Sequence, residues 1–249
     1  MTKQLEAEVI VFDQGNTLIM DPFNLILDLK IDEFVSLFKK HNIPINPKEL
    51  INAWKKSNER VNYKYCGHFS QEEPIIQDAL KSLEIPSHIS VLLGLELLHE
   101  YRIGLKEVIE SDKRTEEVRR TLGKLSKNKR LGVFSDDRIV GLGMVLDFMG
   151  ISNFFEYIET SESIGIEKPD IEVFKHMLNH FGIPPSSVVY VGDDPKRDVD
   201  GAKEAGLKVI LYKVDPRKYN IPWRNYDAET KYKPDAVIEE FSDLADILT

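Results

Sequence analysis

The chain has 249 residues, and its 33 basic and 42 acidic residues give a formal net charge of −9. The length is sufficient to bury a sizeable core, whereas the negative charge argues against a nucleic-acid partner, which would require a basic surface. Because Cys66 is the single cysteine and neither a long apolar run nor a signal peptide is visible, we expect a cytoplasmic protein with no internal disulfide and no membrane partner.

The first predicted element is a strand of four apolar residues, Val9-Ile10-Val11-Phe12, which leads directly into Asp13. A carboxylate at such a strand end can attack phosphorus as a nucleophile, although an aspartate standing alone there more often only caps a turn. Gly15 follows two residues later and permits a tight turn and a close approach of the backbone to a ligand. Asp13 is therefore a candidate nucleophile.

The segment after this strand has a different character. Apolar residues recur there at helical spacing with no clear strand between them. The spacing predicts helices within 23–38, 50–54, 75–83 and 89–101. We expect residues 19–111 to form an all-helical domain inserted into a core made of residues 1–18 and 112–249.

One leucine-rich stretch of this insertion is expected to pack its helices together, with a contact between two copies of the chain as the alternative. It contains Leu92, Leu93, Leu95, Leu97 and Leu98. The sequence is therefore compatible with a monomer or a homodimer.

Beyond residue 112 the chain alternates between helical and strand patterns. Strands are predicted at 131–134, 157–159, 188–191, 209–212 and 235–238, and helices at 115–125, 139–149, 171–181 and 198–205. Such alternation is typical of an α/β fold with a Rossmann-like parallel sheet that helices cover on both faces. Glycines stand just past three of the helices, where a left-handed cap is wanted: Gly150, Gly182 and Gly206.

Polar residues gather where the predicted strands end. Ser135 and Asp136 follow one strand, a lysine precedes Pro169, and Asp193 begins an acidic cluster after another strand. Because the carboxyl ends of parallel strands meet at one edge of a sheet, we expect these groups to converge with Asp13 on one crevice. The crevice would hold several carboxylates, a cation and a hydroxyl, which suits a Mg²⁺ ion and a phosphoryl group.

Each group has a chemical interpretation. Lys168 is biased toward an extended conformation by the proline that follows it, and it can act as a point charge on phosphate. Asp193, Asp194 and Asp198 offer the oxygen ligands that Mg²⁺ prefers. Asp198 has a simpler alternative role, because a carboxylate also serves as the N-cap of a helix.

The four clusters together resemble the haloacid dehalogenase-like superfamily of aspartate-nucleophile hydrolases. The resemblance rests on the order of four motifs: Phe12-Asp13-Gln14-Gly15-Asn16-Thr17-Leu18, Val133-Phe134-Ser135-Asp136, Glu167-Lys168-Pro169-Asp170 and Val191-Gly192-Asp193-Asp194-Pro195-Lys196-Arg197-Asp198. It covers about residues 8–20 and 112–249, while the stretch between matches only in length and helical character. By this resemblance the inserted domain is a cap over the crevice, with an ungated helical domain as the alternative.

The resemblance implies roles for individual residues. Asp13 would form an aspartyl phosphate with help from Lys168. Phosphate binding is assigned to Gly15, Asn16, Ser135, Asp136 and Lys168. Metal binding is assigned to Asp13, Gly15 through its carbonyl, Asp193, Asp194 and Asp198, with Asp194 or Asp198 acting through water or holding Lys168. Asp136, where the family more often has Asn, and its neighbour Asp137 would oppose an anionic substrate if they faced it, so we expect both to point toward solvent or to pair with Arg138.

Gly15 is the main departure, because the family pattern has there a second aspartate that acts as general acid and base. General acid–base catalysis typically raises a reaction rate by about 10²–10⁴-fold. We expect a Mg²⁺-dependent phosphatase that acts on a small phosphorylated metabolite, and because this help is missing we expect it to be slow on alkyl esters. Two alternatives stay open. One is an inactive or weakly active protein that binds phosphate and metal, and the other is a haloacid dehalogenase using the same nucleophile.

Overall fold

The computed structural model describes residues 4–64, 72–215 and 225–248. Cys66 lies outside the described residues. The chain divides into two compact units. We call Met1–Asp21 with Asp112–Thr249 the core unit, and Pro22–Ser111 the helical unit.

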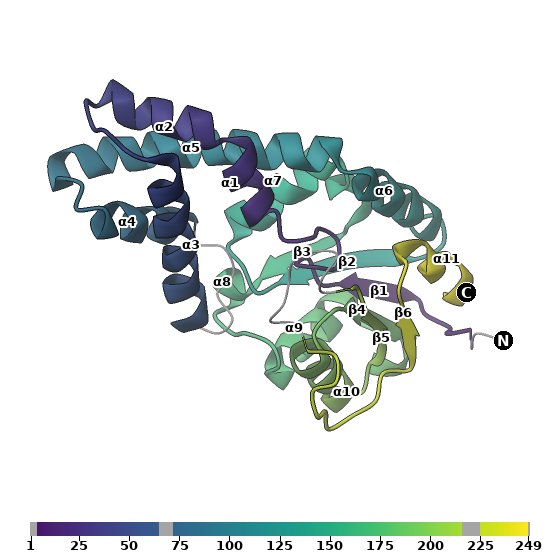
Figure 1. Cartoon of the computed structure of the whole chain (residues 1–249). Helices are drawn as coiled ribbons and strands as arrows, with labels where there is room; N and C mark the ends of the chain where they lie inside the picture. Colours follow the sequence, from purple (N-terminus) through teal and green to yellow (C-terminus); the bar gives the residue numbers. More distant parts are fainter. Residues whose placement is uncertain (1–3, 65–71, 216–224, 249) are drawn as a thin grey trace. The chain divides into compact units, whose positions relative to one another are not determined.

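The core unit is built on a six-stranded sheet in which every pair of neighbouring strands is parallel. The strand order is β3-β2-β1-β4-β5-β6, which places β1 at the centre (Figure 1). The strands are β1 (Val9–Phe12), β2 (Arg130–Ser135), β3 (Tyr157–Thr160), β4 (Val188–Gly192), β5 (Lys208–Tyr212) and β6 (Ala236–Ile238). The prediction of a Rossmann-like parallel α/β sheet is confirmed.

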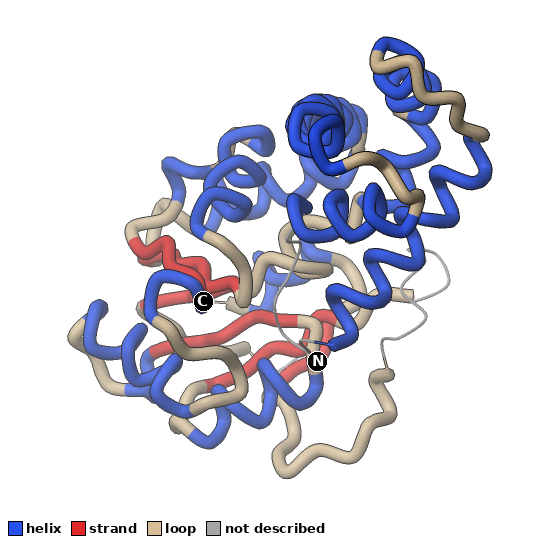
Figure 2. Tube along the Cα trace, turned by 90° about the vertical axis from the view of Figure 1, so that its left-hand side faces the viewer, coloured by secondary structure: helices blue, strands red, loops and turns tan. Residues whose placement is uncertain are grey.

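Helices lie on both sides of this sheet, as the tube in Figure 2 shows. In Figure 1, α6 and α7 lie on one side and α9 and α10 on the other. The α-helices of the core unit are α6 (Lys113–Leu125), α7 (Ile139–Met149), α8 (Ser161–Ile164), α9 (Ile171–Phe181), α10 (Gly201–Glu204) and α11 (Leu244–Ile247). Shorter turns are η1 (Ser152–Phe154), η2 (Pro185–Ser187) and η4 (Phe241–Asp243), and η3 (Pro195–Asp200) is a π-helix.

The predicted helix boundaries hold for α7 and α9, and the three glycines predicted as caps have positive φ angles: 66° at Gly150, 65° at Gly182 and 85° at Gly206. The helix predicted at 198–205 instead begins as the π-helix at Pro195, because the Asp194 side chain caps the chain at that point. Helix α8 was not predicted, because its four residues are too few to show helical periodicity.

The central strand positions the site. All four residues of β1 are buried, as expected for a strand that is covered on both faces. Its last residue, Phe12, pairs in register with Val133 of β2 and Val191 of β4. The loops that follow these three strands therefore leave the sheet side by side.

The helical unit contains α1 (Phe23–Leu29), α2 (Ile31–Lys40), α3 (Pro47–Lys64), α4 (Glu72–Ser82) and α5 (Ser87–Ser111). The single stretch predicted at 23–38 is two helices, because the chain breaks at Lys30 (φ −107°, ψ 12°). The buried Lys30 ammonium lies 3.0 Å from Glu100 and 2.9 Å from Glu107 of α5, and these two ion pairs hold the break against that helix.

Three of the five leucines expected to pack this unit are buried: Leu93, Leu97 and Leu98. The expectation is wrong for Leu92 and Leu95, which are each 54% exposed because they lie on the outer face of α5. Within the part of the chain that the structure describes, no helix is both long and apolar enough to cross a bilayer.

Candidate active site

The predicted site residues meet at the carboxyl edge of the sheet. Asp13 directly follows β1, and its backbone N–H donates to the carbonyl of Val191 on β4, at 2.8 Å. Ser135 ends β2, and Asp193 follows the last residue of β4. Asp13, Ser135 and Asp193 are all buried, with exposed fractions of 7%, 3% and 2%. The register of the parallel strands thus brings Asp13 together with two residues that are more than a hundred positions away from it in the chain.

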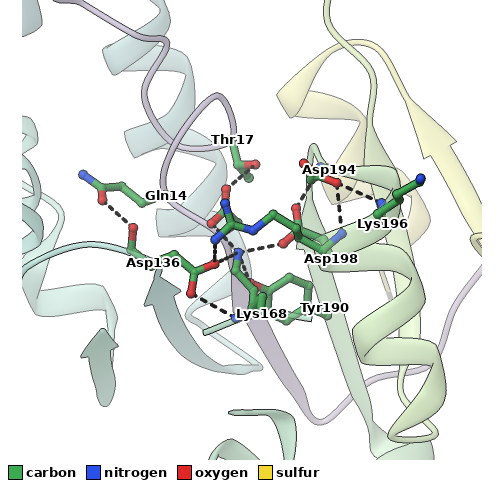
Figure 3. Close-up of polar contacts among 11 residues, drawn as sticks. Gln14, Thr17, Asp136, Lys168, Tyr190, Asp194, Lys196 and Asp198 are labelled. Carbon is green, nitrogen blue, oxygen red and sulfur yellow. Dashed lines mark hydrogen bonds and ion pairs between the residues drawn. The ribbon is translucent and has the colours of Figure 1, made fainter. Parts of the chain in front are cut away.

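Lys168 lies at the centre of the polar contacts (Figure 3). Its Nζ atom is 2.7 Å from Asp13 Oδ1, 2.6 Å from Asp198 Oδ1 and 3.1 Å from the Tyr190 hydroxyl. Burial by itself would lower the pKa of Lys168, but the carboxylates of Asp13 and Asp198 raise it well above its ordinary value. The side chain is therefore a fixed positive charge beside the candidate nucleophile.

The environment of Asp13 disfavours its charged form. Burial raises the pKa of this carboxyl to about 6, and the nearby Asp198 and Asp136 add to the rise, while Lys168 opposes it. The Asp13 Oδ2 atom accepts a long hydrogen bond, 3.4 Å, from the Thr17 hydroxyl. A cation placed beside this carboxylate would favour its ionised form.

Three buried carboxylates, from Asp13, Asp193 and Asp198, each offer an oxygen within 4.8 Å of the others. Mg²⁺ takes about six oxygen ligands and commonly uses only one or two carboxylates together with water and phosphate. The donor set fits this ion, because every candidate ligand is a hard oxygen atom.

Gly192 makes room for this cluster. A Cβ atom added there would lie 2.3 Å from Oδ2 of Asp198, which real Cβ contacts essentially never show. The Asp198 side chain thus passes directly over the end of β4. A side chain at this position would therefore displace Asp198.

Two acids of the fourth motif, Asp194 and Asp198, have distinct roles. Asp194, and not Asp198, is the N-cap of η3, since its Oδ1 accepts from the backbone N–H groups of Lys196 at 2.8 Å and Arg197 at 2.9 Å. The alternative in which Asp198 is only a helix cap is therefore wrong. Asp198 instead binds Lys168 and accepts the Asp194 backbone N–H at 2.8 Å.

Ser135 has a partner that sequence reasoning missed. Its hydroxyl donates to Oε1 of Gln14 at 2.8 Å, and both side chains are buried. Gln14 stands between the candidate nucleophile and Gly15, two positions after a run of four apolar residues. An amide at this position was the available signal, because a buried polar side chain requires a hydrogen-bonding partner.

Neither Asp136 nor Asp137 faces solvent. The expectation is wrong for Asp136, which pairs with another residue, whereas Asp137 contacts Arg138, as the second alternative expected, although through the Arg138 backbone. Asp136 is 1% exposed, and its carboxylate pairs with the guanidinium of Arg197 and accepts the Lys168 backbone N–H at 3.1 Å. Asp137 is 7% exposed and accepts the backbone N–H of Arg138 at 2.6 Å. A basic residue of the fourth motif, 61 positions away, thus compensates the charge of Asp136.

The loop after Asp13 contains the other predicted site residues. Gly15 makes an isolated bridge with Ile19, and Asn16 is buried with φ at 54°. The Asn16 side-chain oxygen accepts the Asp21 backbone N–H at 3.3 Å. The backbone N–H of Asn16 donates to the carbonyl of Ile19 at 2.6 Å. The positive φ of this turn thus falls on Asn16, a residue type that tolerates it, and not on Gly15.

Comparison with known proteins gives consistent matches. The family model described as haloacid dehalogenase-like hydrolase matches residues 27–212. A glyceraldehyde 3-phosphate phosphatase of Methanothermobacter thermautotrophicus is 27% identical over 169 residues, which are 68% of this chain and 70% of that protein. A protein of the same name from Methanocaldococcus jannaschii is 34% identical over 119 residues, 48% of this chain and 49% of that protein. A 2-haloacid dehalogenase structure from Pseudomonas syringae pv. Tomato DC3000 has a TM-score of 0.65 at 22% identity, over 97% of both chains, and shows a shared fold.

Proposed function

Because the family model covers residues 27–212, this chain belongs to the haloacid dehalogenase-like hydrolase family, and we propose that it is a Mg²⁺-dependent phosphatase acting on a small phosphorylated metabolite. The observation that carries the proposal is the convergence of three buried carboxylates, within 4.8 Å of one another, on the ammonium of Lys168. Dehalogenation by a carboxylate needs no metal, so such a cluster favours phosphoryl transfer. The two archaeal relatives named as phosphatases support this choice.

Asp13, Asp193 and Asp198 would hold the metal, together with the backbone carbonyl of Gly15. When bound there, Mg²⁺ would supply positive charge that offsets the repulsion between a carboxylate nucleophile and a phosphate anion. We do not retain Asp194 as a direct ligand, because its Oδ1 atom already accepts two backbone N–H groups.

The reaction on this chain has two steps. An oxygen of Asp13 forms a bond to phosphorus while the bond from phosphorus to the leaving oxygen breaks, and water then hydrolyses the aspartyl phosphate to release inorganic phosphate. Lys168 binds a phosphate oxygen as a point charge, and Ser135 donates its hydroxyl to another after turning away from Gln14. Since Gly15 provides no acid, the leaving oxygen takes its proton from solvent or from the substrate itself.

The helical unit is proposed to act as a cap. A cap that excludes water would strengthen the electrostatic contacts of the site and would carry the residues that recognise the rest of the substrate. Both archaeal relatives are named for a triose phosphate, which supports a substrate of that size class.

A panel of phosphate compounds tests the proposal. Inorganic phosphate release should be measured for acyl, aryl and alkyl phosphates, including glyceraldehyde 3-phosphate, with Mg²⁺ and with EDTA. We expect release that requires Mg²⁺. Chloride release from 2-chloropropionate in EDTA would favour the dehalogenase alternative. Binding of phosphate and Mg²⁺ without turnover of any compound would favour the binding protein.

A further inference from the structure

The Asp136 carboxylate is held by donors from two other loops of the site. Oδ1 accepts the Lys168 backbone N–H at 3.1 Å, and Oδ2 pairs with the guanidinium of Arg197. The Lys168 ammonium lies 3.9 Å from the same Oδ2 atom and is a third positive or donor group beside this carboxylate. The side chain is 1% exposed, so these protein groups replace its contact with water. A carboxylate engaged in this way repels a phosphate anion and is poorly suited to bind one.

Arg197 joins this carboxylate to the metal-ligand loop. It lies in η3, one residue before Asp198, and its own backbone N–H donates to the Asp194 cap at 2.9 Å. Its side chain is 21% exposed, which leaves the pair with Asp136 largely shielded from solvent. The ion pair therefore connects the end of β2 with the turn that carries Asp198.

The energetics of such a pair are asymmetric. Removing one partner of a buried pair leaves an uncompensated charge, whereas replacing both partners can be almost neutral. Here the uncompensated charge would be the Asp136 carboxylate, which lies beside Lys168. Loss of the guanidinium would thus leave Asp136 free to pull the ammonium away from Asp13.

We propose that Asp136 and Arg197 form an ion-pair latch that positions Lys168 and Asp198 around Asp13 without contacting the substrate. Both are positioning residues, because they act through Lys168 and Asp198. The effect on turnover rests on the phosphatase function proposed above, but the latch itself is a property of the fold.

A double-mutant cycle tests the latch. The variants are Asp136→Asn, Arg197→Gln and the two combined, and Lys196→Gln is the matched control because it removes an adjacent exposed positive charge. For Arg197→Gln we expect kcat to fall about tenfold or more, with KM changed by less than about threefold. The double variant should recover about tenfold of that loss, within the coupling usual for contacting residues. Lys196→Gln should behave as wild type.

Two outcomes would overturn the latch. If the losses of the single variants multiply in the double variant, Arg197 acts independently of Asp136. If Arg197→Gln raises KM and leaves kcat unchanged, the guanidinium binds substrate directly. Should Arg197→Gln not fold, Arg197→Met takes its place, because it also removes the charge and keeps an unbranched side chain.

Amide hydrogen exchange provides a measurement that needs no activity. Asp136→Ala removes the acceptor of the Lys168 N–H, so that amide should exchange faster than in wild type, whereas Asp136→Asn keeps a carbonyl acceptor and should preserve its protection. Unchanged exchange in Asp136→Ala would overturn the latch. If the wild type hydrolyses no phosphate compound while this amide responds as expected, the proposed function fails, whereas the contact by which Asp136 positions Lys168 stands.

Discussion

The ammonium of Lys168 lies 2.7 Å from Oδ1 of Asp13, so the candidate nucleophile and the cation proposed to bind phosphate are in direct contact. Within the described part of the chain, the other carboxylate oxygen, Oδ2, accepts only the 3.4 Å hydrogen bond from Thr17. One oxygen of Asp13 is therefore fixed by the lysine, and the second is more loosely held.

Asp13→Asn is expected to lower kcat by at least about 10²-fold, because the amide has nearly the same shape but cannot attack phosphorus. Steady-state phosphate release with the best substrate of the panel measures the loss. Asp246→Asn, at an exposed position of α11, is the control and should keep full activity. Activity above about one per cent in Asp13→Asn, against the loss expected for a reaction-centre group, would remove Asp13 from the nucleophile role.

Mg²⁺ binding should weaken as the pH falls through about 6, the value to which burial raises the pKa of Asp13. A raised pKa means that the neutral form of the carboxyl is populated below that pH, and a neutral carboxyl is a poor ligand. The apparent affinity is expected to fall about tenfold for each further unit of pH. Isothermal titration calorimetry between pH 5 and 8 measures it. An affinity that is constant over this range would argue against Asp13 as a ligand.

Gly192→Ala should displace Asp198, because the added Cβ would lie 2.3 Å from the Asp198 Oδ2 atom. We expect loss of most Mg²⁺ affinity and activity in a protein that still folds. Gly143→Ala is the matched control, since a Cβ there meets nothing within 4 Å and alanine favours the α7 helix by about 1 kcal/mol. Melting temperature, Mg²⁺ titration and turnover are measured for both variants. Normal activity in Gly192→Ala would mean that Asp198 is dispensable.

Gly15 should make the enzyme selective for good leaving groups. The leaving groups of acyl and aryl phosphates depart without a proton. The rates of hydrolysis of these compounds should therefore exceed those of alkyl phosphates by about 10²–10⁴-fold, the range assigned to acid catalysis. Gly15→Asp should narrow this gap, and no positive φ opposes the substitution, because the left-handed residue of the loop is Asn16.

Circular dichroism and Mg²⁺ binding must first show that Gly15→Asp leaves the site intact. Equal wild-type rates on alkyl and aryl phosphates would then mean that another residue supplies the acid, and the account of Gly15 as a catalytic deficit would be wrong.

Sequence patterns alone were sufficient to predict the parallel sheet and the edge of the sheet on which the site lies. The run Val9–Phe12 and the strands before Ser135 and Asp193 are mostly apolar stretches that end at polar residues, and the parallel topology then determines that Asp13, Ser135 and Asp193 share one edge. The glycine caps were predictable for a similar local reason, because glycine adopts a left-handed φ more readily than any other residue.

Only the tertiary structure decided which polar groups pair with one another. Asp194 and Asp198 are both acids of one motif, and the π-helical start of η3 makes the first a cap and turns the second toward Lys168. Asp136 finds Arg197 across 61 positions of sequence, which no local pattern reports. Such pairings depend on side-chain geometry between separate loops, and the free energy of burying a charge selects the arrangement in which each carboxylate meets a donor.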